Sequence, residues 1–248
     1  MKLTQYITST IDRFPKGYVF TYANFPAKVK QKEAVIKALN RLAFSGKISK
    51  LSKGKYFKPE NSVFGNLQPS QAQIVKDLLR ENRKIVGYLT GYSIYNQLGL
   101  TTQVSAVIQI GKNQIRPNFK RGNYRILFVR QKNIITEENI PLLQFLDAIA
   151  AIKKIPDSNI ENSCTRFLAI IKKFSDKQIN DLVRLALKYP PCTRALLGAL
   201  LEELGQIKTT ETLFKSLNPI TKYRLAGSEK ILSTTKKWNI VGTVSKYI

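Results

Sequence analysis

The sequence predicts an α+β fold, in which an N-terminal winged helix-turn-helix precedes a larger mixed domain. Three observations support this prediction: a helix-then-hairpin pattern near the N-terminus, strand-like segments in the middle of the chain, and helical periodicity from residue 137 onward. The larger domain is expected to hold a small β-sheet or hairpin and a C-terminal helical layer. The expected boundaries are residues 1–60 for the winged helix, 61–68 for a linker and 69–248 for the second domain.

The clearest local pattern lies in residues 31–59. Apolar residues recur at helical spacing and predict a helix over residues 31–45, which Gly46 ends. Two short strands around Lys53-Gly54 then read as a hairpin. A first helix over residues 3–14, a short extended piece and one helical turn precede them, which completes the element order of a winged helix.

The polar face of the helix over residues 31–45 is basic. At 100° per residue, Lys30, Lys37 and Arg41 fall within roughly 40° of one another, opposite the apolar stripe, and Asn40 flanks them. Arg and Asn can read base edges in a major groove, whereas Lys mostly meets phosphate. A solvated helix face is the alternative, and the basic hairpin beside the helix argues against it. The residues expected to face DNA are Lys30, Lys37, Asn40, Arg41, Lys53 and Lys55.

The formal charge of the 248-residue chain is +25, which favours a polyanionic partner. Nucleic acid is the expected partner, and an anionic membrane surface is the alternative. No apolar run approaches the roughly 20 residues of a membrane span. The N-terminus lacks the apolar core and cleavage site of a signal peptide. We therefore expect a cytoplasmic protein with no membrane partner.

The middle of the chain suggests a second anion-facing surface. Residues 82–136 contain nine basic residues and no Asp or Glu, whereas a solvated surface normally carries both signs. A merely basic exterior is the alternative. The candidate residues for this second anion-binding surface are Lys112, Arg116, Lys120, Arg121 and Arg125.

Periodicity places further elements along the second domain. Strand-like segments are expected at residues 84–88, 104–110 and 124–129, and helices at residues 70–83, 90–98, 138–155, 159–174, 176–188, 191–204 and 210–217. The tail from residue 219 carries Trp238 and matches no element clearly.

No catalytic constellation is recognisable. The chain has no histidine, and most of its carboxylates stand singly on predicted helix surfaces. Asp147 could be a buried carboxylate, and Tyr88, Thr90, Tyr92 and Ser93 could hydrogen-bond a ligand, yet nothing nearby supplies a base. No phosphate-cradling glycine loop is present. We therefore predict no catalytic residue, no metal site, no cofactor and no enzymatic activity.

Several segments resemble the AbiEi-like antitoxins of type IV toxin–antitoxin systems, which act in abortive infection. The N-terminal ones are VFTYANF and AVIKALNRLAFSGKISKLSKGKYFKP, the middle one is GYLTGYSIYNQLGLTTQV, and the later ones are PLLQFLDAIAAIKKIP and YPPCTRALLGALLEELG. The resemblance implies a winged helix that binds the promoter of its own operon, and a C-terminal domain needed for antitoxin activity. It also implies a nucleotidyltransferase-like toxin as functional partner, with or without a stable complex.

Two other readings remain open. In the first, the winged helix targets a nucleic-acid-processing enzyme, such as a nuclease, whose turnover would depend on Asp147 or Glu138. In the second, the chain is a basic RNA-binding protein.

Overall fold

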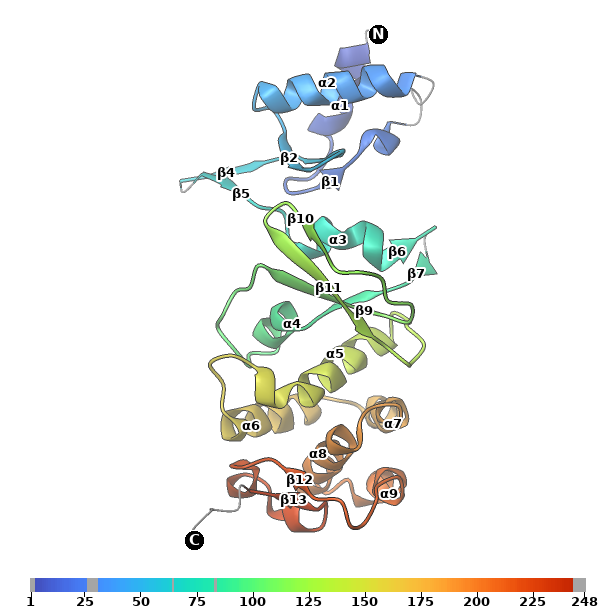
Figure 1. Cartoon of the computed structure of the whole chain (residues 1–248), viewed down its shortest axis with the longest axis vertical. Coiled ribbons are helices and arrows are strands. Elements are labelled where there is room, and N and C mark those ends of the chain that lie inside the picture. Colours follow the sequence, from blue (N-terminus) through green and yellow to red (C-terminus); the bar gives the residue numbers. More distant parts are fainter. Residues whose placement is uncertain (1–2, 26–30, 64, 83, 243–248) are drawn as a thin grey trace. The chain divides into compact units, whose positions relative to one another are not determined.

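A computed structural model describes residues 3–25, 31–63, 65–82 and 84–242. The chain has an α+β fold and divides into two compact units (Figure 1). Unit 1 holds residues 1–78 and 119–125, and unit 2 holds residues 79–118 and 126–248. The division differs from the boundary expected within residues 61–68.

Unit 1 begins with the element order of a winged helix-turn-helix. Its elements are α1 (Leu3–Asp12), β1 (Val19–Phe20), η1 (Tyr22–Asn24), α2 (Lys32–Phe44), β2 (Ser49–Ser52) and β3 (Lys55–Phe57). The strands form an antiparallel sheet of order β1-β3-β2, in which Phe57 is opposite both Val19 and Ser49. The expected second helix is a 3₁₀ turn in the described residues, capped by Thr21.

Unit 1 continues beyond the winged-helix elements. Residues expected as a linker form a hairpin of β4 (Glu60–Ser62) and β5 (Gly65–Leu67), and α3 (Gln71–Leu79) follows. Two side chains of α3 form hydrogen bonds with the backbone amide and carbonyl of one residue in β1. The Val19 amide donates to Gln73 Oε1 at 3.3 Å, and Lys76 Nζ donates to the Val19 carbonyl. These contacts explain why α3 belongs to unit 1.

Unit 2 contains most of the mid-chain strands. In chain order the segments are β6 (Arg80–Glu81), β7 (Lys84–Ile85), β8 (Tyr88–Thr90), α4 (Tyr92–Gln97), β9 (Val107–Lys112), β10 (Phe119–Arg121) and β11 (Tyr124–Arg130), of which β10 and the first residues of β11 belong to unit 1. The sheet of unit 2 has the order β11-β9-β8, and Thr90 is opposite Gln109. Strand β10 was not predicted, because it lies in a polar stretch without apolar alternation.

The helical layer of unit 2 surrounds α8. Its helices are α5 (Asn139–Ala150), η3 (Ile152–Lys154), α6 (Ile160–Ile171), α7 (Asp176–Ala186), α8 (Pro191–Glu203) and α9 (Ile207–Lys215). Helices α5, α6, α7 and α9 all contact α8. Every residue from Ala195 to Leu201 in α8 is buried, as expected for a helix covered on all sides. None of the helices in the described part of the chain has the length and apolar composition that a transmembrane segment requires.

The C-terminal segment packs onto α8 through the one tryptophan of the chain. Trp238 is fully buried, and its Nε1 donates to Glu202 Oε2 at 3.1 Å. A Cβ added to Gly198 would lie 2.1 Å from the Trp238 ring, so the indole occupies the space that this glycine leaves. Around it run η4 (Ser228–Lys230) and η5 (Ser233–Lys236), and β12 (Tyr223–Arg224) pairs in parallel with β13 (Ile240–Val241).

The contact between Gly198 and Trp238 gives a stability prediction. Alanine in a helix is normally about 1 kcal/mol better than glycine. Here Gly198→Ala should instead destabilise the protein by about 1–3 kcal/mol, because the methyl group would overlap the indole. The measurement is urea unfolding followed by far-UV circular dichroism.

A double-mutant cycle provides the control. In a Trp238→Ala background, which itself should cost about 3–5 kcal/mol, Gly198→Ala should lose its penalty. An equal penalty in both backgrounds would contradict the overlap as its cause.

Candidate functional site

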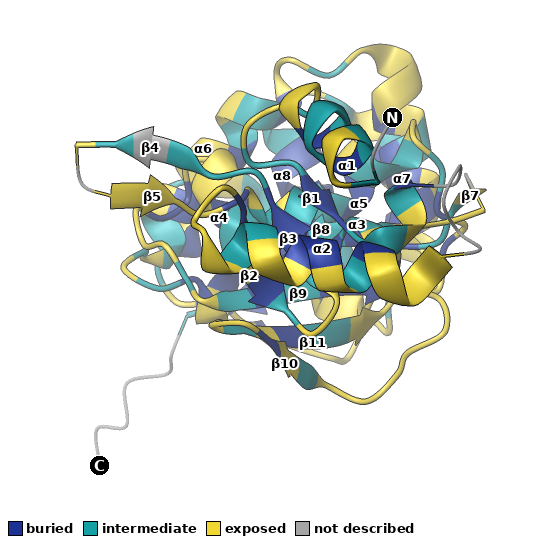
Figure 2. Ribbon diagram, turned by 90° about the horizontal axis from the view of Figure 1, so that it is seen from above, coloured by how far each residue is buried: buried dark blue, intermediate teal, exposed yellow. Residues whose placement is uncertain are grey.

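The first candidate surface is the exposed face of α2. Val35, Ala38 and Leu39 are buried in the core of unit 1, and Lys37 and Arg41 are exposed. Figure 2 shows α2 with both buried and exposed residues along its length. The apolar spacing fixes this orientation, because residues three and four apart share one helix face. The helix therefore presents the cations that the sequence predicted on its solvent side.

Asn40 is exposed on α2 and is held by a neighbouring strand. Tyr56 Oη on β3 donates to Asn40 Oδ1 at 2.7 Å. Burial raises the pKa of Tyr56, so its hydroxyl remains a proton donor at neutral pH. The hydrogen bond occupies the amide oxygen and leaves the amide NH₂ as the group that Asn40 can offer to a ligand.

Two of the predicted cations are engaged inside unit 1. Lys55 Nζ lies 3.0 Å from Asp77 Oδ2, and Arg121 donates to both oxygens of Asp77 at 2.6 and 3.0 Å. Arg121 is only 7% exposed and also donates to the Ile74 carbonyl. Lys55 as a DNA-facing residue and Arg121 as part of a free anion-binding surface are therefore corrected, because both side chains are held by Asp77 within unit 1.

The electrostatics of Asp77 agree with this geometry. Partial burial alone would raise the pKa of this carboxyl group, but the hydrogen bonds and charges of Arg121 and Lys55 lower it below its usual value. The pKa of Lys76 is lowered, first by burial and then by the nearby charge of Lys55. The ion pairs consequently join elements of unit 1 to one another, with Asp77 at the surface and Arg121 buried.

The remaining predicted cations differ in position. Lys53 is exposed at the β2–β3 turn, and Lys30 lies outside the described residues. Of the second surface, Arg116, Lys120 and Arg125 are exposed and Lys112 is half-buried. Lys112 and Arg116 belong to unit 2, whereas the other two belong to unit 1. Within either unit, the predicted second surface is thus reduced to two residues.

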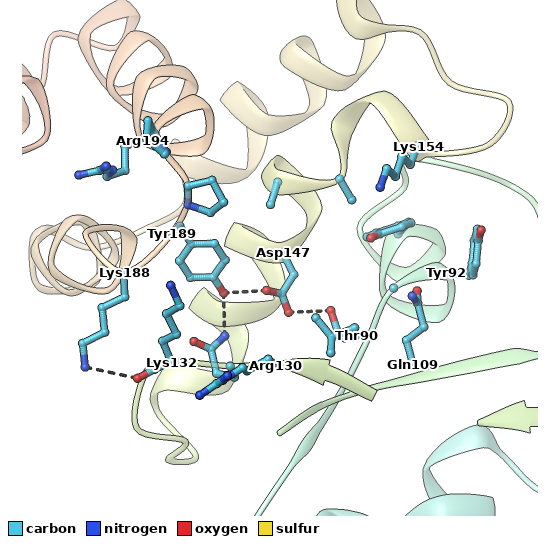
Figure 3. Close-up of a pocket in the computed structure, with 18 of the residues that line it drawn as sticks. Thr90, Tyr92, Gln109, Arg130, Lys132, Asp147, Lys154, Lys188, Tyr189 and Arg194 are labelled. Carbon is cyan, nitrogen blue, oxygen red and sulfur yellow. Dashed lines mark hydrogen bonds between the residues drawn. The ribbon is translucent and has the colours of Figure 1, made fainter. Parts of the chain in front are cut away.

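Unit 2 contains a second candidate site, a cavity of about 750 Å³ (Figure 3). It lies among β8, the start of α4, the end of β11, α5 and the α7–α8 connection. Asp147 is the single carboxylate that lines it among the described residues. Five cationic side chains also line it: Arg130, Lys132, Lys154, Lys188 and Arg194.

Asp147 on α5 is the centre of a hydrogen-bond network beside this cavity. Tyr88 Oη and Thr90 Oγ1 both donate to its Oδ2 at 2.7 Å, and Tyr189 Oη donates to its Oδ1 at 2.7 Å. Gln131 Nε2 in turn donates to both tyrosine hydroxyls, at 2.8 and 2.9 Å. The network links the sheet, α5 and the α7–α8 connection of unit 2.

Burial sets the protonation behaviour of these groups. Desolvation raises the pKa of Asp147 above its usual value, although the hydroxyls of Tyr189, Tyr88 and Thr90 each act in the opposite direction. Burial and the charge of Asp147 raise the pKa of Tyr88 and of Tyr189. Both phenols therefore stay protonated donors, and a tyrosinate is strongly disfavoured here.

A glycine shapes the edge of the cavity. Gly91 has φ of +74°, and a Cβ there would lie 1.7 Å from Gln109 Oε1. Only the absence of a side chain lets the Gln109 amide lie against the start of α4. The Thr-Gly-Tyr sequence at residues 90–92 thus supplies a donor to Asp147, space for Gln109 and an aromatic wall.

Sequence reasoning found part of this site. It singled out Asp147 as a possible buried carboxylate, and Tyr88, Thr90 and Tyr92 as possible hydrogen-bonding groups. It missed Gln131 and Tyr189, which are each more than 40 residues from one of their partners and carry no local pattern. Ser93 does not line the cavity. Glu138, the other carboxylate considered for catalysis, is exposed before α5.

The acidic residues give no metal cluster in the described part of the chain. No three or more Cys, Asp or Glu side chains come close enough there to hold an ion. Cys164 is buried, which raises the pKa of its thiol to about 12.

Comparison with known proteins gives a family and a fold. Residues 6–182 match the profile of a family described as "Family of unknown function (DUF6088)". The crystal structure of the RV2827C protein from Mycobacterium tuberculosis is similar, with a TM-score of 0.59 and 12% sequence identity. The similarity covers 96% of this chain and 90% of that one, and at this identity it concerns the fold alone. A search of curated proteins finds no match.

The raised pKa of Asp147 predicts a pH dependence of stability. A carboxyl group whose pKa is higher in the folded than in the unfolded state stabilises the fold when protonated. That contribution is complete below the ordinary value of 3.8 and disappears as pH rises through the folded-state pKa. Relative to Asp147→Asn, the wild type should therefore lose free energy of unfolding with rising pH, by at most about 1.4 kcal/mol per pH unit.

The measurement compares urea midpoints of the two proteins between about pH 4 and pH 8, with m-values taken into account. Asp176→Asn, at an exposed position of α7, controls for the loss of one carboxylate. If the wild type instead gained free energy of unfolding relative to Asp147→Asn as the pH rises, the hydroxyl donors would outweigh burial.

Proposed function

The chain belongs to DUF6088, a family of unknown function, and we propose that this member is a DNA-binding autoregulator that binds double-stranded DNA at its own promoter through α2 and the β2–β3 turn. We further propose that it acts as the antitoxin of a type IV toxin–antitoxin system. Its functional partner would then be a nucleotidyltransferase-like toxin.

The observation that carries the DNA-binding proposal is the exposed face of α2. This face combines two cations, Lys37 and Arg41, with the fixed amide of Asn40. A 13-residue helix is about 20 Å long and fits a major groove about 12 Å wide. An Arg and an Asn on adjacent positions of one helix suit guanine and adenine edges, respectively. Lys53 at the β2–β3 turn would meet phosphate beside the groove.

The charge balance of this part of the chain agrees with a polyanionic partner. Residues 1–68 hold 13 Lys and Arg against three acidic residues. Lys47 and Lys58 bind Asp12, through its side chain and its backbone, respectively, and Lys55 binds Asp77. The exposed cations on α2 and at the turn therefore define the expected footprint better than the net charge does.

The antitoxin proposal is supported by the resemblance of segments throughout residues 15–205 to AbiEi-like antitoxins. The segment GYLTGYSIYNQLGLTTQV supplies β8 and the wall of the cavity in unit 2. The part of the chain expected to act on the toxin is thus also the part that holds the Asp147 network.

Substitution of Arg41 tests DNA reading directly. Arg41→Ala should weaken binding to the promoter fragment by about 1–3 kcal/mol, because a bidentate contact to guanine is lost. Arg41→Lys keeps the charge and should lose most of the same specificity. Binding is measured by fluorescence anisotropy on the promoter fragment and on random duplex at several salt concentrations.

Two controls belong to this experiment. Lys53→Ala should weaken binding to both duplexes equally and reduce the salt slope by about one. Lys208→Ala, an exposed position on α9, removes the same charge outside the proposed footprint. Equal losses on both duplexes for Arg41→Ala would reduce its role to a phosphate contact. Tighter binding to structured RNA than to any duplex would overturn the DNA proposal.

Co-expression tests the antitoxin proposal separately. The proposal requires a nucleotidyltransferase-like protein to be encoded beside this chain, and the chain should restore growth of cells that express it. The Lys37→Ala/Arg41→Ala variant should still restore growth when both genes are driven by a foreign promoter, because DNA binding is then dispensable. Failure of the wild-type chain to restore growth, with both proteins detected, would overturn this proposal and leave the DNA proposal intact.

A further inference from the structure

The cavity of unit 2 has the size of a small-molecule site. Its volume of about 750 Å³ falls within the roughly 300–1,000 Å³ typical of such pockets. Apolar side chains form much of its wall, including Val129, Ala150, Leu187 and Pro190. A ligand that fills it must therefore bury an apolar or aromatic part as well as any charged group.

The charges around the cavity favour an anion. Five cationic side chains face a single carboxylate, and three hydroxyl donors already engage that carboxylate. Lys188 Nζ lies 3.4 Å from the Lys132 carbonyl oxygen, so these two residues are neighbours. The excess positive charge would repel a metal ion or an organic cation and attract a phosphate or carboxylate group.

The first turn of α8 adds one cation, Arg194, to the lining of the cavity. Arg194 lies in this turn and donates through Nη1 to the Ser216 carbonyl at 3.1 Å. Its Nε is buried and has no hydrogen-bond partner among the described residues, which is unusual for a guanidinium group. The positive end of the helix dipole also lies at this turn. Arg194, Lys188 and Lys132 thus form a cationic side of the cavity (Figure 3).

The opposite side carries aromatic and amide groups (Figure 3). The rings of Tyr92 and Tyr95 on α4 meet edge to face, with centroids 6.1 Å apart. The amide of Gln109 lies beside them against Gly91, and Lys154 completes this side. An aromatic ring and an amide are the groups that stack on a nucleobase and hydrogen-bond to its edge.

We propose that this cavity binds a nucleoside phosphate. The phosphate contacts Arg194, Lys188 and Lys132, and the base stacks on Tyr92 beside Gln109. Asp147 positions the walls through Tyr88, Thr90 and Tyr189 and is not itself a ligand-binding group. The ligand is either a free nucleotide or the phosphorylated end of a single strand. All residues of the site belong to unit 2, so the proposal is independent of DNA binding by α2.

Calorimetric titration of the full chain tests the proposal. The probes are AMP, GMP, CMP and UMP at up to about 1 mM, in about 150 mM salt so that weak electrostatic binding is screened. At least one nucleotide should bind, and the matching nucleoside and inorganic phosphate should each bind at least about tenfold more weakly. Equal affinity for nucleotide and inorganic phosphate would overturn the assignment of a base site.

Variants at exposed or half-buried positions locate the site. Lys132→Ala/Lys188→Ala should weaken nucleotide binding by about tenfold or more, because two charge-assisted contacts are lost. Tyr92→Leu should weaken it as well, and Tyr92→Phe should retain it, because the ring remains available for stacking. Lys173→Ala, an exposed lysine outside the cavity, is the matched control and should bind like wild type. Equal binding by all of these variants would overturn the proposal.

A strand with a 5′-phosphate separates the two sources of the ligand. In the Lys37→Ala/Arg41→Ala background, a phosphorylated tetranucleotide that binds at least about tenfold more tightly than any mononucleotide, and loses this binding when Lys188 or Tyr92 is changed, would identify a strand end. The reverse result would identify a free nucleotide. Failure of both probes would overturn the proposal, whatever the outcome of the promoter experiment.

Discussion

A half-buried carboxylate held by three hydroxyl groups is the constraint on which the architecture of unit 2 depends. Burying the Asp147 carboxylate without partners would be costly, and three hydroxyl donors offset part of that cost. Two of these donors come from β8 and the third from the α7–α8 connection. The carboxylate on α5 therefore fixes the edge of the sheet against the helical layer. The cavity lies beside this junction, and Asp147, Thr90 and Tyr189 belong both to the network and to its lining.

The two units use charge in different ways. In unit 1, Asp77 binds Lys55 and the buried Arg121, and the cations left on α2 and at the β2–β3 turn define an exposed face. In unit 2, the cations that line the cavity face one carboxylate that is already hydrogen-bonded. A formal charge of +25 is thus divided among structural ion pairs, an open helix face and a concave site. The positions of these cations, more than their number, decide which of them can meet a ligand.

Short-range sequence patterns predicted the features that depend on residues close together in the chain. Helix α2 and its buried face follow from the spacing of Val35, Ala38 and Leu39, and the core of α8 follows from a run of apolar residues. Contacts between distant segments were beyond the sequence. Arg121 and Asp77 are 44 residues apart, and Trp238 and Gly198 are 40 apart in number, so no short-range periodicity reports either contact. The two members of the Asp147 network that were missed, Gln131 and Tyr189, depend on the same kind of distant contact.

The ion pairs of Asp77 have a consequence for how the polypeptide is made. Arg121 completes the interior of the first unit, although 40 residues of the second unit, residues 79–118, are synthesised before it. During translation, the N-terminal elements can form early. Asp77 can pair with Lys55 at that stage, but it cannot pair with Arg121 until about half of the polypeptide has left the ribosome. A fragment cut at residue 60 or 68 would lack both α3 and the strand that carries Arg121. Unit 1, which contains α2, is therefore built from two separate stretches of the sequence, residues 1–78 and 119–125.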